Sequence, residues 1–307
     1  MPAHDCTPNS SWVIQANSEF TLRASVPIQS GESITQLYSQ PTAGTQERQV
    51  HLRQSKFFDC TCKRCLDPTE LGTFFSAIKC PVCPDGYLLL ETPTDVLSNW
   101  KCDNDKCVRV IPEVFVEDVL ERIRSDLLNL QNNSEESNSG QLKSVGVIEK
   151  LLKTHQGKTV HPNHYTMHTL ENELLQRMSF VLSSSYLQNG NEKDNIADRM
   201  VQLARKNVTI ADIIWPGFNR HRGRLLYFLQ QGLLIPLNRV AGQKRAKKLP
   251  ANKLSELKSI FEEVLQTRKT VHAILSIEPA GREESFIANM MTENSEEILN
   301  LRKIFKN

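Results

Sequence analysis

The sequence that decides the fold reads Phe57-Phe58-Asp59-Cys60-Thr61-Cys62-Lys63-Arg64-Cys65, then Cys80-Pro81-Val82-Cys83, and then Cys102-Asp103-Asn104-Asp105-Lys106-Cys107. Seven of the eight cysteines lie in this stretch, and the eighth is Cys6. A tetrahedral zinc ion with bonds of about 2.3 Å to sulfur needs several thiolates close together, and closely spaced cysteines supply them. The spacing therefore predicts zinc binding.

Two Cys-x-x-Cys hooks divide the eight sulfurs into two sets of four. The second hook and the cysteine pair that follows it are spaced much as in a zinc ribbon, so they complete one site by themselves. The first hook and the thiol just before it supply three sulfurs, and Cys6 is the only cysteine left to complete that site. We predict two structural Zn²⁺ ions, one held by Cys6, Cys60, Cys62 and Cys65 and the other by Cys80, Cys83, Cys102 and Cys107.

Three alternatives to this partition stay open at the level of sequence. The cysteines could be unpaired core residues, although two Cys-x-x-Cys pairs argue against this. They could form disulfides, although short spacings suit metal better and nothing marks the chain for secretion. Finally, one ion could be shared by the two hooks, with Cys62, Cys65, Cys80 and Cys83 as its ligands.

Length and composition place broad limits on the protein. The chain has 307 residues, enough for two domains with real cores, and 39% of them are hydrophobic. No apolar run approaches the roughly twenty residues that span a bilayer, and the first residues show no secretory signal, so we expect a soluble protein without a membrane partner. The net charge of +2 is too small to indicate a nucleic-acid partner, and we expect none. Zinc thiolates need a reducing compartment, so we expect a cytoplasmic or nuclear location.

The first 56 residues are predicted to be β-rich and irregular. Apolar and polar residues alternate over Phe20–Ala24, which is the period of a half-buried strand, and a second strand is expected over Trp12–Gln15. Turns are predicted at residues 17–19 and at 29–32, followed by a short strand over Ile34–Tyr38.

A family resemblance rests on three motifs of this chain: His4-Asp5-Cys6-Thr7-Pro8-Asn9; Gly31-Glu32-Ser33 with Tyr38 after it; and Phe58-Asp59-Cys60-Thr61-Cys62-Lys63-Arg64-Cys65. They resemble the second half of a SET domain with its post-SET zinc site, as found in the SMYD family. In that family the loop cysteine is the fourth zinc ligand, which agrees with the count that links Cys6 to Cys60. The second ribbon, with Trp100 before Cys102, resembles the arthropod group called SmydA.

The resemblance implies transfer of a methyl group from S-adenosyl-L-methionine to a lysine of a protein or peptide substrate. Such a displacement depends on holding a neutral amine against the sulfonium, although lysine normally titrates near 10.4. The resemblance places Tyr38 at the methyl-transfer point, Phe58 against the adenine of the cofactor, and His4 in the loop that lines the cofactor. Without the flanking motifs, Tyr38 and Phe58 would simply be core aromatics.

Several departures from the family pattern weaken the expectation of catalysis. Ala3 stands where the family has asparagine, Asp5 replaces a serine, and Lys56 stands where many members have a tyrosine. The glycine-rich cofactor loop, the N-terminal strands and the MYND finger of the family would all precede Met1. We therefore expect this chain to be inactive, as a short isoform or an incomplete gene model.

The rest of the chain, from residue 111 to 307, is predicted to be α-helical. Apolar residues recur at helical spacing, most clearly at Leu170, Leu174 and Met178, and such stripes are overwhelmingly core positions. Helices are expected at about 112–131, 141–155, 163–184, 192–213, 218–235, 251–277 and 281–305, with a polar linker at 132–140. Paired amphipathic helices suggest a helical-repeat array, and the SMYD family ends in a TPR-like helical domain.

Other clusters have weaker functional interpretations. His161, His164 and His168 have metal-like spacing, yet no carboxylate or thiol joins them, so a metal site there is a minor alternative. A basic run over residues 239–248 is more typical of a solvated loop than of a nuclear import signal.

We predict an α+β protein with three parts: the C-terminal half of a SET domain (1–56), a post-SET zinc region with a ribbon (57–110) and a helical TPR-like domain (111–307). Its function resembles that of a SAM-dependent protein-lysine methyltransferase of the SMYD type. The alternative is a binding module, in which the zinc core stiffens a helical surface that engages a partner protein.

Overall fold

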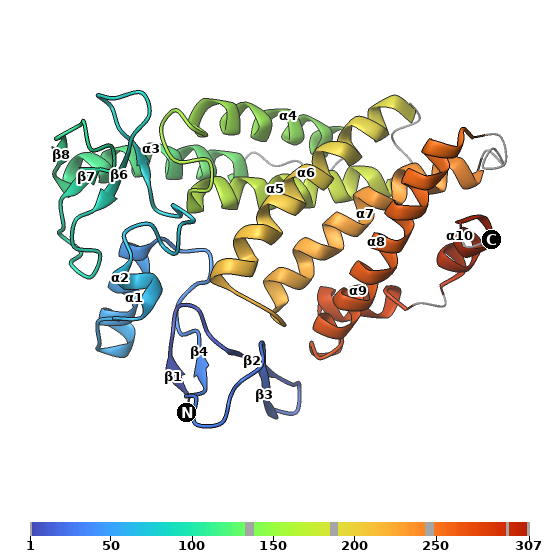
Figure 1. Ribbon diagram of the computed structural model, residues 1–307, viewed down its shortest axis with the longest axis horizontal. Helices are drawn as coiled ribbons and strands as arrows, with labels where there is room; N and C mark the ends of the chain where they lie inside the picture. Colours follow the sequence, from blue (N-terminus) through green and yellow to red (C-terminus); the bar gives the residue numbers. More distant parts are fainter. Residues whose placement is uncertain (1, 133–137, 185–189, 243–248, 293–294, 306–307) are drawn as a thin grey trace. The chain divides into compact units, whose positions relative to one another are not determined.

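The computed structural model describes residues 2–132, 138–184, 190–242, 249–292 and 295–305 (Figure 1). It is a mixed structure of short strands and many helices, which confirms the predicted α+β class. The chain forms two compact units, of which the first comprises Met1–Asn9, Pro27–Arg177 and Asp212–Pro216, and the second comprises Ser10–Val26, Met178–Ala211 and Gly217–Asn307. These units are defined by packing within the chain. They do not test the three-part division by motif, which stays a prediction.

The first unit begins with two short parallel strands, β1 (Ala3–His4) and β4 (Thr35–Gln36). The side chain of Asn9 secures this pair, since it accepts a hydrogen bond from the Thr35 amide at 2.8 Å and donates one to the Ser33 carbonyl at 2.9 Å. The strand predicted over residues 34–38 therefore exists, although it is shorter than expected. Its pairing holds the loop that carries Cys6.

Helix α1 (Thr45–Lys56) follows and was not predicted from the sequence. Its buried residues are spaced as one helical face, but three of the four are polar: Thr45, Arg48, Gln49 and Leu52. A search for apolar periodicity cannot detect such a face. The helix ends at Phe57, whose left-handed backbone (φ 61°) turns the chain toward the cysteines, and the short helix α2 (Lys63–Leu66) comes next.

A four-stranded antiparallel sheet occupies the cysteine-rich region after α2. Its strands are β5 (Ile78–Lys79), β6 (Tyr87–Leu90), β7 (Trp100–Cys102) and β8 (Val110–Ile111), paired in that order. Helices α3 (Glu113–Asn132), α4 (Asn138–His155) and α5 (Tyr165–Ser183) follow, and α3 packs against α4. The predicted linker at 132–140 lies largely outside the described residues, and its last three residues begin α4.

The second unit contains a β-hairpin and most of the remaining helices. Strands β2 (Ser10–Ile14) and β3 (Phe20–Ala24) form the predicted hairpin. The helices are α6 (Gly190–Ile214), which ends in the first unit, α7 (Arg220–Gly242), α8 (Ala251–Leu275), α9 (Glu283–Met290) and α10 (Glu296–Phe305).

Two helix predictions in this unit differ from the structure. Helix α7 continues through Pro236, beyond the predicted end at residue 235, and the single helix expected at 281–305 is two helices. Helices α7 and α8 lie side by side, and α9 and α10 pack against them (Figure 1). The basic run at 239–248 falls largely outside the described residues. Among the helices described, none is both long enough and apolar enough to span a bilayer.

A buried ion network joins α1 to α2 in the first unit. The Glu70 carboxylate contacts the guanidinium groups of Arg48 and Arg64, each at 2.8 Å, and all three side chains are at most 1% exposed. Burial alone would raise the pKa of Glu70, but the two cations lower it to about 2. Burial and the charge of Arg48 lower the pKa of Arg64, yet its guanidinium stays charged at neutral pH.

Replacing Glu70→Ala is expected to lower the free energy of unfolding by about 3–5 kcal/mol, because it leaves two buried cations without their counter-ion. Urea denaturation of the zinc-loaded protein measures the change. Arg53→Ala is the matched control, since Arg53 lies on α1 as Arg48 does, and its ion pair with Asp59 joins two side chains that are about half exposed (47% and 49%). A Glu70 variant as stable as this control would contradict the structural role of the network.

Candidate metal centres and the adjoining aromatic cluster

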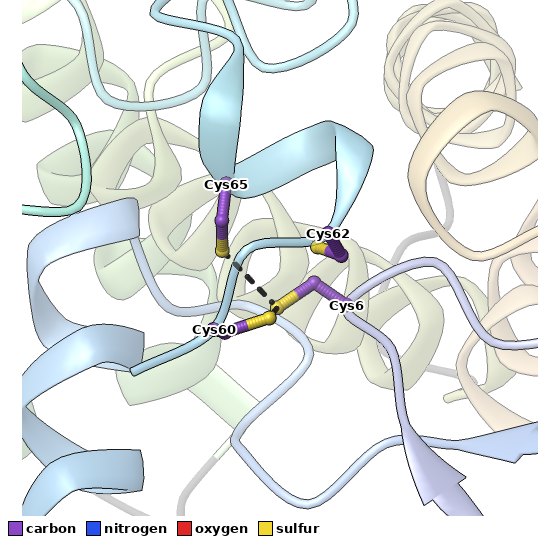
Figure 2. Close-up of side chains that lie close together, drawn as sticks. All are labelled: Cys6, Cys60, Cys62 and Cys65. Carbon is purple, nitrogen blue, oxygen red and sulfur yellow. Dashed lines mark hydrogen bonds between the residues drawn. The ribbon is translucent and has the colours of Figure 1, made fainter. Parts of the chain in front are cut away.

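The first cysteine cluster joins residues that are more than fifty positions apart. The sulfur of Cys6 lies 3.5 Å from that of Cys65 and 4.0 Å from that of Cys60, and Cys62 completes a set whose four sulfurs all lie within 4.8 Å of one another (Figure 2). The predicted grouping is therefore the one that the structure brings together, and the alternative that pairs Cys62 and Cys65 with the second hook is not observed. None of the four is in a disulfide.

Helix α1 fixes this cluster through its polar face. The side chain of Gln49 exchanges two hydrogen bonds with the backbone of Cys60, donating to its carbonyl at 2.8 Å and accepting from its amide at 3.0 Å. Arg48 donates to the Cys65 sulfur at 3.6 Å. Sequence reasoning missed both residues, and the only signal that could have found them is their shared spacing with the buried Leu52.

The geometry and charge of the first cluster fit a zinc ion. Bonds of about 2.3 Å in a tetrahedron place sulfurs about 3.8 Å apart, close to the separations observed. A zinc ion with four thiolates carries a charge of −2, and the guanidinium of Arg48 lies against it. Burial alone would lower the pKa of Arg48, whereas Glu70 and the cysteines Cys6 and Cys65 raise it. The cluster could therefore hold Zn²⁺.

The second cluster is formed by the ends of the four-stranded sheet. The sulfurs of Cys80 and Cys107 lie 3.9 Å apart and those of Cys83 and Cys102 lie 3.5 Å apart, within a set that spans 4.8 Å. Gly86 lies directly beneath it, because an added Cβ would be 2.4 Å from the Cys102 sulfur and 2.7 Å from that of Cys83. This cluster too could hold Zn²⁺.

The three residues predicted for methyl transfer lie together beside the first cluster. The ring of His4 is 5.3 Å from that of Tyr38 and 5.7 Å from that of Phe58, and both aromatic residues pack against the cysteine core. The Tyr38 amide donates to His4 Nδ1 at 3.0 Å, so the other ring nitrogen carries the proton and faces the Cys6 sulfur at 3.3 Å. Burial lowers the pKa of His4, which favours this neutral form. Lys56 lies 5.8 Å from the Tyr38 ring.

The three histidines with metal-like spacing occupy packing positions. His161 stacks on Phe74 at 5.0 Å and meets Tyr87 at 4.7 Å, while His164 and His168 are buried. Burial lowers the pKa of His164 to about 3. Among the described residues, the only groups with metal-site geometry are the two cysteine clusters.

Comparison with known proteins agrees with the motifs. The chain is 34% identical over 110 residues to the SET domain-containing protein SmydA-8, isoform A, of Drosophila melanogaster, a match that covers 36% of this chain and 23% of the relative. It is 32% identical over 156 residues to protein-lysine N-methyltransferase SMYD4 of Mus musculus, covering 49% of this chain and 16% of the relative. A SET domain-containing protein of Dictyostelium discoideum is 32% identical over 110 residues, 35% of this chain and 24% of that protein.

The matched segments therefore make up less than a quarter of each of these relatives. No protein-family model matches the chain. The resemblance to SMYD-type SET-domain proteins is confirmed for the matched part.

Metal analysis of the purified chain is expected to find about two zinc ions per molecule, and Cys6→Ser to leave about one, because it opens only the first cluster. Inductively coupled plasma mass spectrometry measures both. Cys83→Ser should also leave one, and the double variant none. Retention of both ions by the Cys6 variant would contradict the first ligand set.

Gly86→Ala is expected to lose the second zinc and keep the first, because the new methyl group would occupy the space of two ligand sulfurs. Zinc content and thermal unfolding measure the effect. Gly146→Ala in α4 is the control, since an added Cβ there meets nothing within 4 Å. Full zinc content in the Gly86 variant would show that the cluster does not need this glycine.

Proposed function

We propose that the chain carries the zinc-stabilised side of a SET-type methyl-transfer site, with S-adenosyl-L-methionine as cofactor and a lysine of a protein as acceptor. The observation that carries this proposal is the grouping of His4, Tyr38 and Phe58 against the first cysteine cluster. The similarity to SET-domain proteins, one of them named a protein-lysine N-methyltransferase, supports it. Because zinc thiolates favour a reducing compartment, we place the protein in the cytoplasm or nucleus.

The cofactor would supply a methyl group on a sulfonium, and the chain's residues would position the reacting groups. The hydroxyl of Tyr38 donates its proton to the Pro2 carbonyl, so its oxygen is left to accept a hydrogen bond from an amine N–H. That contact would orient the nitrogen lone pair toward the methyl carbon. Phe58 would offer an apolar face to the adenine, and neutral His4 would add no repulsion toward the sulfonium.

Zinc would act on this site only through structure. The Cys6 loop carries His4, and Phe58 lies two residues before Cys60, so one ion would fix both relative to Tyr38. Removal of the first ion is therefore expected to disperse the three side chains, whereas the cysteines of the second cluster lie in and around a separate sheet.

A second candidate function is a protein-binding module with a TPR-like helical part. The pairwise packing of α7 with α8, and of both with α10, supports it. Methyl transfer requires the cofactor, whereas a binding module does not. A cofactor-binding measurement therefore separates them.

We expect saturation-transfer NMR on the zinc-loaded chain to detect bound S-adenosyl-L-methionine through its adenine protons. In the Phe58→Ala variant this signal should disappear. Phe57→Ala is the matched control, because that neighbouring ring is 87% exposed and lies outside the aromatic cluster. Absence of any transfer to the cofactor, with both zinc ions present, would overturn the methyl-transfer site and favour the binding module.

The expected inactivity of the chain alone stays a prediction. Three side chains are a small part of a tight cofactor site, so we expect binding weaker than about 1 μM and no measurable methylation of lysine peptides. Titration calorimetry and a methyl-transfer assay check this. Micromolar binding that Phe58→Ala abolishes would contradict the expected weak binding, and turnover would show that the chain is active.

A further inference from the structure

A cavity of about 480 Å³ opens in the first unit, on the other side of α1 from the cysteine cluster. Its walls come from α1, the strand β7, helix α3 and the start of α5. This volume is within the range of small-ligand sites. On α1 the lining residues share one helical face: Gln46, Glu47, Val50, His51 and Gln54.

The floor of the cavity is aromatic and buried. Trp100 is 2% exposed and Tyr165 is 8% exposed, and both line the cavity. Gly44 allows this close packing, because an added Cβ would lie 2.8 Å from the Tyr165 ring. The indole N–H of Trp100 has no hydrogen-bond acceptor among the described residues.

The rim of the cavity is acidic. Three carboxylates line it, from Glu47, Glu113 and Glu117, against one guanidinium, that of Arg124, which gives a formal charge of −2 with His51 neutral. Arg124 is already engaged, since it contacts Glu117 and lies 3.3 Å from Glu47 and 3.6 Å from Glu121. Glu113 has no ion-pair partner in the described part of the chain, so it is open to a cation.

We propose that this cavity binds a peptide through one basic side chain, lysine or arginine. An ammonium or guanidinium is attracted both by the carboxylates of the rim and by the faces of aromatic rings. A free metal ion fits less well, because no group of carboxylates here has metal-site geometry among the described residues. The proposal does not depend on methyl transfer.

The cavity also lies close to the aromatic cluster. His51 is part of its lining, and its Nε2 lies 3.2 Å from the Tyr38 carbonyl oxygen, to which it can donate. A peptide held by its basic side chain would therefore lie beside the backbone of Tyr38. The recognition step and any chemistry at Tyr38 stay separable, because the two use different side chains.

The test uses three blocked pentapeptides that differ only at the central residue, which is lysine, arginine or the neutral norleucine. The indole N–H resonance of Trp100, assigned with Trp100→Phe, is followed during titration of the zinc-loaded chain, and calorimetry gives the affinities. We expect both basic peptides to shift this resonance and the norleucine peptide to bind at least about tenfold more weakly. Raising the NaCl concentration from about 50 to about 300 mM should weaken the binding of the basic peptides.

Two test variants separate the contribution of charge to binding from that of cavity volume. The double substitution Glu113→Gln and Glu117→Gln is expected to lower the affinity for the basic peptides by about tenfold or more. The control Glu121→Gln, on the same helix but outside the lining, should change this affinity by less than about twofold. Val50→Trp fills the cavity without changing its charge and should abolish binding. Zinc content confirms that each variant is folded.

Three results would overturn the proposal. The first is an unshifted Trp100 resonance at millimolar basic peptide, and the second is equal binding of the norleucine peptide. The third is unchanged binding by the folded Val50→Trp variant. No cofactor is present in these titrations, so their outcome is independent of the methyl-transfer proposal.

Discussion

The first unit depends on one contact between distant parts of the chain, the approach of the Cys6 sulfur to those of Cys60, Cys62 and Cys65. Two-residue strands cannot hold the first loop in place by themselves, because each contributes few hydrogen bonds and little buried surface. The sulfur cluster supplies the missing constraint if it holds zinc, and the buried Arg48 balances its charge. The positions of His4 and Phe58 follow from that single constraint.

Much of this core could be predicted because sulfur chemistry leaves few choices. Eight cysteines with two hooks permit few sets of four, and counting alone linked Cys6 to Cys60. The hairpin of Trp12 and Phe20 was also predictable from alternation. Helix α1 was not, because its buried face is built from side chains such as Arg48 and Gln49 that a hydrophobic pattern excludes. They are buried because they bond to the cysteine segment, which local sequence does not reveal.

The acidic cavity was hidden for a different reason. Its lining comes from four elements, and no two of Glu47, Trp100, Glu113 and Tyr165 are close enough in sequence to form a motif. Each residue alone has an ordinary explanation as a surface carboxylate or a core aromatic. Only the packing of α3 and β7 against α1 brings these carboxylates and aromatic rings around one cavity. A site of this kind therefore has no sequence signature.

The two sites meet in α1. The residues that face the cysteines, among them Arg48 and Leu52, are two positions along from those that face the cavity, among them Val50 and Gln54. Two positions correspond to about 200° around a helix, so the two sets lie on opposite faces. The buried bonds of one face fix the rotation of the helix about its axis, and that rotation sets where the carboxylate of Glu47 points. The metal centre and the cavity are thus two consequences of how one polar helix is held.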